Sequence, residues 1–191
     1  SRFEVETGMY DIGVTGILPG ENAEVLQADV TLEADMNYDI FAVGNVSDDT
    51  LSLLTVTSME TAVDAGNAQV QIVHAASMAP TVDIYVTAPD TDITTEQPLV
   101  TAEFTDATDL IQVPAGDYQI RITPAGETTV VYDSGTVNLA DGADLLIAAT
   151  NNVGTGDSPV TLLAADGDGS FKIWDAEAGA AIRVVHGISD A

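Results

Sequence analysis

Apolar and polar residues alternate with a period of two along most of this chain. Clear examples are Val82-Asp-Ile84-Tyr-Val86 and Tyr118-Gln-Ile120-Arg-Ile122. Because the side chains of an extended strand point alternately to its two faces, this spacing predicts β-strands. The same spacing recurs at residues 70–72, 136–139, 145–147 and 160–162, with clusters of Gly, Pro, Asn and Asp between the stretches. Short strands with such turns, about seven to a unit, predict an all-β fold of antiparallel, immunoglobulin-like β-sandwich repeats.

Three segments recur in the same order about 110 residues further along the chain. The matched pairs are Phe3–Val14 with Ile111–Ile122, Ala28–Asn45 with Gly135–Asn151, and Ala68–Ser77 with Ala180–Ser189. The first pair aligns Tyr10 with Tyr118, and the third aligns the only two histidines, His74 and His186. A repeat of this length predicts tandem copies of one β-sandwich unit.

The matches also predict how the chain is divided. Residues 1–66 correspond to the C-terminal part of one unit, 68–166 to a complete unit, 167–179 to an acidic linker and 180–191 to the opening strand of a further unit. We therefore expect the chain to be a piece of a longer array. Since half a sandwich leaves an apolar face and strand edges uncovered, we expect the strand at Ile182–His186 to complete residues 1–66, within one chain or by strand exchange between two chains.

Two stretches of the sequence carry a family resemblance. They are Ala68–Val86 (AQVQIVHAASMAPTVDIYV) and Val113–Ala149, which begins VPAGDYQIRI. The chain resembles a bacterial family of repeated extracytoplasmic domains of unknown function, whose units open with a Val-Arg-Val-Val-His-Ala-Ser-Pro-Asp-Ala-Pro-like signature. Met78 and Ala79 stand where that signature has Pro and Asp. The resemblance implies a secreted, periplasmic or cell-surface protein, and it implies no particular activity.

The charge of the chain is strongly one-sided. Its 31 acidic residues face only four basic ones, which gives a formal net charge of -27. Phosphate recognition depends on clustered Lys and Arg, so this balance argues against nucleic acid and anionic membrane surfaces as partners. Two explanations of the acidity stay open. The carboxylates form a dispersed shell suited to salty surroundings, which we favour because they are scattered singly, or some of them converge on Ca²⁺.

The strongest metal candidate is the acidic segment that begins at Asp166. Asp166, Asp168 and Ser170 offer oxygen ligands at alternate positions, and Glu177 stands at position 12 counted from Asp166, as in an EF-hand calcium loop. Position 6 is Phe171, where that loop requires Gly, and no flanking helices are evident. We therefore favour an acidic linker over a calcium site, and we expect no other cofactor.

Each histidine ends an apolar strand and enters a turn of small residues. With one imidazole to a unit, we predict that His74 fixes its turn through a backbone carbonyl and is neither a metal ligand nor a catalytic base. Asp83 is a candidate for orienting the His74 ring. His186 is expected to take the same position in the next unit.

Catalytic templates are missing from the sequence. The chain has no cysteine, no Gly-X-Ser-X-Gly elbow and a single indole, Trp174. No stretch approaches the ~20 apolar residues of a membrane span. We predict a non-enzymatic, extracytoplasmic structural, adhesive or binding module whose partner is a protein or glycan at the cell surface. The alternatives are a Ca²⁺-stabilised recognition domain and, last, a carboxylate-dependent hydrolase.

Overall fold

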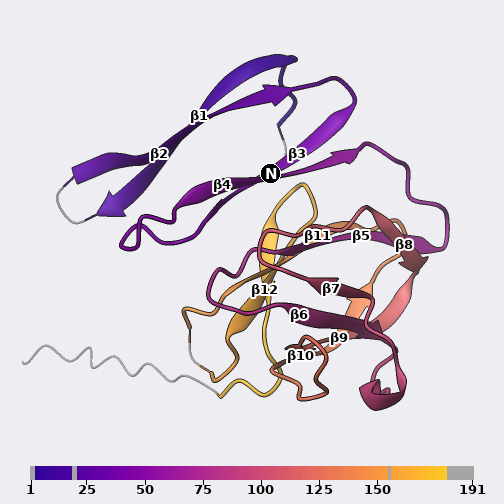
Figure 1. Cartoon of the computed structure of the whole chain (residues 1–191). Coiled ribbons are helices and arrows are strands. Elements are labelled where there is room, and N and C mark those ends of the chain that lie inside the picture. Colours follow the sequence, from indigo (N-terminus) through magenta and orange to yellow (C-terminus); the bar gives the residue numbers. More distant parts are fainter. Residues whose placement is uncertain (1–2, 19–20, 155, 180–191) are drawn as a thin grey trace, which may run out of the picture.

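The computed structural model describes residues 3–18, 21–154 and 156–179 (Figure 1). Regular structure in these residues is strand, apart from one 3₁₀ helix, η1 (Ile93–Thr95). The strands in chain order are β1 (Gly8–Leu18), β2 (Glu21–Leu32), β3 (Met36–Val43), β4 (Ser52–Met59), β5 (Asn67–His74), β6 (Val82–Thr87), β7 (Val100–Ala102), β8 (Ile111–Pro114), β9 (Gly116–Pro124), β10 (Tyr132–Leu139), β11 (Asp144–Asn151), β12 (Val160–Ala165) and β13 (Ser170–Ile173). The alternating stretches of the sequence all lie within strands, so the predicted all-β fold is confirmed.

Strands β5 to β13 form a sandwich of two sheets. One sheet has the order β10-β9-β6-β7, and the other has the order β13-β12-β11-β5-β8 (Figure 1). Ile84 and Ile122 from the first sheet face Ile147 and Leu162 from the second, and all four side chains are at most 5% exposed. Alternation places the polar residues between them on the outer faces of the sheets.

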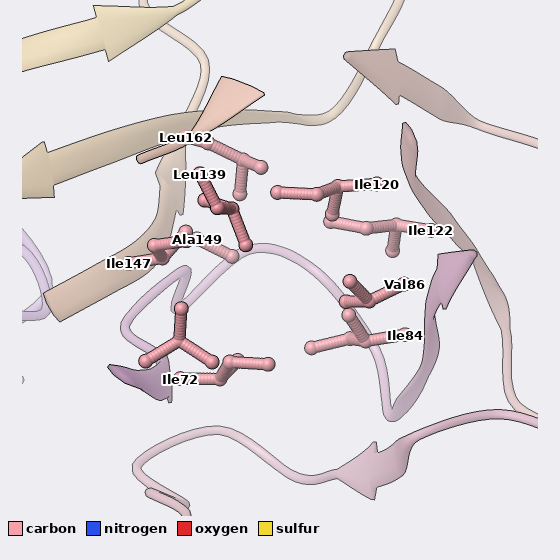
Figure 2. A pocket seen from close by; sticks show the side chains of 10 residues that line it. Ile72, Ile84, Val86, Ile120, Ile122, Leu139, Ile147, Ala149 and Leu162 are labelled. Atoms are coloured by element: carbon pink, nitrogen blue, oxygen red, sulfur yellow. The ribbon is translucent and has the colours of Figure 1, made fainter. Parts of the chain in front are cut away.

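The interior of the sandwich is filled by aliphatic side chains. Figure 2 shows ten of them meeting from the two sheets, and the space left between them is about 20 Å³. A void of that size holds about one water molecule, and apolar voids stay dry. The region shown in Figure 2 is therefore packed core and has no room for a ligand.

Two features of the sandwich differ from the sequence-based expectation. Among the described residues it has nine strands and not about seven, because β7, β8 and β13 have only three or four residues each and are too short to show a period. In addition, β5 and β11 pair in parallel. The chain between them passes mainly through the other sheet, so no tight hairpin forces these two strands to run in opposite directions.

The N-terminal strands form two hairpins, β1–β2 and β3–β4, each a separate two-stranded sheet among the described residues. Val43 and Val56 of the second hairpin are buried against Val73, Leu146 and Ala148. Those three residues lie on the outer face of the five-stranded sheet, since their neighbours along the strands face the sandwich core. The β3–β4 hairpin is thus covered on one side by the sandwich (Figure 1). The predicted completing strand, Ile182–His186, lies outside the described residues.

Candidate functional site

His74 is the last residue of β5 and is fully buried. Its Nδ1 accepts a hydrogen bond from the backbone N–H of Ala76 at 3.3 Å, and its Nε2 lies 3.1 Å from the carbonyl oxygen of Pro80. Because a backbone N–H can only donate, Nδ1 must be the acceptor, and the Nε2–H group therefore donates to the Pro80 carbonyl oxygen. The ring also packs edge-on against Phe104, with the ring centroids 6.4 Å apart. Both ring nitrogens thus hold the turn that follows β5.

Asp83 does not orient this ring, and the proposed pairing is wrong. The two carboxylate oxygens of Asp83 accept hydrogen bonds from the hydroxyl of Thr101 and from the backbone N–H of Gly126. Asp83 stands between the core residues Val82 and Ile84 of β6, so alternation turns it to the outer face of the four-stranded sheet. His74 belongs to the other sheet. His186, the second predicted marker, lies outside the described residues.

Asp166 closes the turn between β12 and β13. Its Oδ1 accepts hydrogen bonds from the backbone N–H groups of Gly169, at 2.8 Å, and Asp168, at 3.1 Å. The hydrogen bond from Gly169 is the main cause that lowers the pKa of the Asp166 carboxyl below its ordinary value. Gly167 has a φ of 86°, a left-handed conformation that favours glycine. The Asp-Gly-Asp-Gly stretch is therefore built as a tight hairpin turn.

The other predicted calcium ligands lie along the chain after this turn. Ser170 begins β13, and Glu177 follows Asp175, whose Oδ1 accepts the Glu177 backbone N–H at 3.0 Å. The four extended residues of β13 span roughly 13 Å and carry Glu177 away from the Asp166 turn. Within the described part of the chain, no group of three or more His, Asp or Glu side chains is placed to hold a metal ion. The calcium site stays a prediction without a cluster to support it.

An acidic cleft of about 740 Å³ opens beside Tyr132. Four carboxylates line it, contributed by three separate segments: Asp133, Asp157, Asp175 and Glu177. Tyr132 itself is 1% exposed, and its hydroxyl donates to the carbonyl of Ile173 at 2.8 Å. Burial, followed by the charges of Asp175 and Asp133, raises the pKa of the Tyr132 hydroxyl. Sequence reasoning found Glu177 but missed this cleft, because only the fold brings the three segments together.

A buried polar layer covers the outer face of the four-stranded sheet. Gln119 donates to both carboxylate oxygens of Asp133 at 2.8 Å, and it accepts the backbone N–H of Asp90. Arg121, which is 8% exposed, donates from Nη2 to the hydroxyl of Thr87 at 2.7 Å. These contacts tie the loop after β6 to the sheet, so the layer serves the scaffold.

The loops that follow β5 and β11 lie at the same end of the sandwich, because these two strands run in parallel. The Asn151 side chain joins the loops. Its Oδ1 accepts the Met78 backbone N–H at 3.0 Å and its Nδ2 donates to the Ser77 hydroxyl at 3.0 Å. Met78 is 81% exposed and Val153 is 88% exposed. Two large apolar side chains therefore project into solvent from braced loops.

The second loop is braced from within. The Asn152 side chain accepts the Gly154 N–H at 2.9 Å and donates to the Ser158 carbonyl at 2.9 Å. Ser158 is buried, and its hydroxyl donates to the Val160 carbonyl. Sequence reasoning identified Asn151 and Asn152 only as turn residues. The one sequence feature that could have indicated this exposed surface was an apolar residue, Met78, at a turn position.

Two adjacent segments of the chain, residues 2–85 and 86–191, match one family model, described as Domain of unknown function (DUF4397). The border between the segments falls within β6, inside the sandwich. No curated protein matches the chain. Among the described residues, no helix has the length and hydropathy of a membrane span.

Proposed function

The chain belongs to this family of domains of unknown function, and we propose that it is a non-catalytic, extracytoplasmic structural or adhesive module. In this proposal the sandwich is the scaffold, and the loops after β5 and β11 bind a protein or glycan at a cell surface. The observation that carries the proposal is the pair of exposed apolar residues, Met78 and Val153, on two loops joined by Asn151.

Binding residues commonly sit on loops that a rigid scaffold positions. Here His74 supports the loop that carries Met78, because its ring nitrogens bind Ala76 and Pro80 on either side of that residue. A preorganised loop loses little conformational entropy when a partner binds. Both nitrogens of the His74 imidazole are thereby used to hold a loop, which supports a binding role over a catalytic one.

The surroundings of the loop end favour particular partner surfaces. Val130 is 40% exposed, and it lines the acidic cleft together with Asp133 and Asp157. An apolar contact area beside carboxylates suits a partner with exposed apolar groups next to Lys or Arg. The net charge of -27 repels anionic partners over the whole molecule.

The extracytoplasmic location is part of the proposal. The resemblance to repeated extracytoplasmic domains supports it, and so does an acidic surface that salty surroundings would screen. The chain contains no cysteine, so its stability needs neither a reducing nor an oxidising compartment.

The test is a binding screen with a matched pair of variants. The fluorescently labelled chain is applied to arrays of glycans and of extracellular protein domains, beside a variant that carries Met78→Asp and Val153→Asp. Loss of two apolar anchors is expected to weaken a specific interaction at least tenfold, since anchor residues contribute about 1 kcal/mol or more each.

The control variant for this screen is Met59→Asp in the N-terminal hairpin, where the methionine is 67% exposed. It should bind as the unmodified chain does. Binding that survives the double change, or that Met59→Asp abolishes equally, would contradict the proposed surface. Turnover in a hydrolase screen that one Asp substitution abolishes would favour the carboxylate-dependent hydrolase instead.

A further inference from the structure

We propose that the edge of β3 that pairs with no other described strand accepts residues 180–187 of a second copy of the chain as a parallel strand, as β11 accepts β5. Strand addition of this kind joins copies head to tail. The inference concerns assembly and does not depend on the proposed binding function.

The first step is that the N-terminal hairpins repeat part of the sandwich. In β1–β2, Gly8 lies opposite Leu32, and Tyr10 lies opposite Val30. In β9–β10, Gly116 lies opposite Leu139, and Tyr118 lies opposite Val137. The register is the same in this part of both hairpins, up to the bulge in β10 between Asp133 and Thr136. The β3–β4 and β11–β12 hairpins follow in the same order and are likewise antiparallel.

The second step is that the N-terminal hairpins and the matching hairpins of the sandwich differ in the strands that pair with their outer edges. β9 has β6 on its other edge, and β11 has β5 on its other edge. In the part of the chain that the structure describes, β1 and β3 each pair only with their own hairpin partner. Unpaired N–H and C=O groups along such an edge are a template for an added strand.

The third step is the groove that this leaves. It measures about 790 Å³ and lies between β1–β2 and the start of β3. Ile12 and Leu32 line it and are only half-buried, whereas their counterparts in the complete sandwich, Ile120 and Leu139, are 4% and 2% exposed. Residues contributed by β5 and β6 seal the corresponding space in the sandwich, as Figure 2 shows for Ile72 and Ile84.

The fourth step identifies the occupant. Ala180–His186 matches Ala68–His74, which is the stretch that forms β5 apart from Asn67. The segment 180–187 carries a single charge, that of Arg183. Six acidic residues line the groove: Glu4, Glu6, Glu33, Asp35, Asp39 and Glu60. An apolar strand with one guanidinium therefore complements the groove in both shape and charge.

The last step assigns the strand to a second copy. The match to β5 begins at Ala180, so the strand would start directly after Gly179. Gly179 lies at the acidic cleft beside Val130 and Tyr132, next to the start of β10. The β3–β4 hairpin packs on the outer face of the five-stranded sheet, and Figure 1 shows it on the far side of the sandwich from the yellow end of the described chain. No residues remain between Gly179 and the strand to cross that distance.

Sedimentation velocity over a range of micromolar concentrations tests the association. The 191-residue chain should form species of at least twice its own mass, and Val184→Pro should stay monomeric, because proline removes an N–H from the added strand. Ala191→Pro lies beyond the matched segment and should associate normally. A chain that is monomeric throughout, or a Val184→Pro variant that associates as well as the unmodified chain, would overturn the proposal.

Cross-linking tests where the segment binds and whether it comes from the same chain or from a second one. The chain has no cysteine, so Ile40→Cys in β3 and Val184→Cys in the added segment each introduce one thiol, and Val184 is chosen because it matches the core-facing Ile72. The two single-cysteine variants carry tags of different length, so that they can be told apart by mass. When they are mixed and treated with a short bis-maleimide, they should form a covalent dimer that contains one of each. A double variant that closes only within its own chain would show that the segment folds back. Absence of the mixed dimer in a sample that associates would place the contact elsewhere, and either result overturns the proposal.

Discussion

The hydroxyl groups of Tyr10 and Tyr118 make the same hydrogen bond, each to the backbone carbonyl four residues earlier. The distances are 2.7 Å to Glu6 and 2.8 Å to Pro114. Each tyrosine stands two residues after a glycine that begins its strand, Gly8 in β1 and Gly116 in β9. The two corners are built alike, in agreement with the sequence alignment of these residues. The division of the chain into repeat units stays a prediction.

Tyr118→Phe tests the value of this corner. The change removes the hydroxyl and leaves the Pro114 carbonyl without that donor, so the free energy of unfolding should fall by about 1 kcal/mol. Urea unfolding followed by circular dichroism measures the change. Because Tyr10 makes the same bond, Tyr10→Phe is the matched variant. An unfolding curve of Tyr118→Phe that superposes on that of the unmodified chain would show that the bond contributes nothing.

His74→Leu tests the buried imidazole. The variant leaves the Ala76 N–H and the Pro80 carbonyl without the ring, and unsatisfied buried groups cost about 1–3 kcal/mol each. We expect the free energy of unfolding to fall by about 3 kcal/mol, with a matching loss in urea midpoint.

The same variant also checks the correction at Asp83. A double-mutant cycle with Asp83→Asn should give a coupling energy near zero, because Asp83 binds Thr101 and Gly126 and does not contact the ring. A coupling energy above about 1 kcal/mol would mean that the two side chains act on each other after all.

The buried hydroxyl of Tyr132 should make the folded chain less stable at alkaline pH. The pKa of its hydroxyl is raised in the folded state, mainly by burial, whereas an unfolded tyrosine titrates near about 10. Above that pH the unfolded chain loses a proton that the folded chain keeps, so unfolding becomes more favourable as pH rises. Tyr132 should therefore leave the melting temperature unchanged below pH ~10 and lower it above that pH.

Tyr132→Phe is the variant that isolates this effect. It loses the hydrogen bond to Ile173 at every pH, so its melting temperature should be lower throughout. Its decline above pH ~10 should be shallower than that of the unmodified chain. Equal slopes in the two proteins would assign the alkaline instability to other groups.

Cations distinguish the two explanations of the acidity. If the carboxylates form a dispersed shell, NaCl should raise the melting temperature by screening the net charge of -27. CaCl₂ at equal ionic strength should do no more than NaCl, and a chelator should have no effect, because Oδ1 of Asp166 already accepts two backbone N–H groups. A specific rise with CaCl₂ that Asp166→Asn removes would instead establish a calcium site.

The strands of the sandwich were predictable where the alternation is long. β6 and β9 each show it over five residues, and both lie where the pattern predicts. β7 and β13 were missed because three or four residues do not define a period. Asp83 was assigned to the wrong neighbour for a related reason. Alternation gives the side of the sheet on which a residue lies, and it does not give the sheet or the side chain that it meets.

The candidate site was less predictable than the fold. The sequence placed His74 at a turn and predicted its backbone carbonyl contact, and the geometry of Pro80 agrees. The sequence could not indicate that Met78 and Val153 lie on neighbouring loops, because the two loops come together only through the parallel pairing of β5 with β11. The acidic cleft shows the same limit, since Asp133, Asp157 and Asp175 are distant along the chain.

By itself, the sequence determined the all-β class, the equivalence of Tyr10 and Tyr118, the acidic composition and the resemblance to the family. These depend on local spacing and composition, which a linear chain carries in full. Only the tertiary structure decided that β5 lies parallel to β11, that the β3–β4 hairpin packs on the outer face of the sandwich, and which loops share an end. Those relationships are long-range pairings, and many of them are compatible with one alternating pattern until the burial of apolar side chains selects among them.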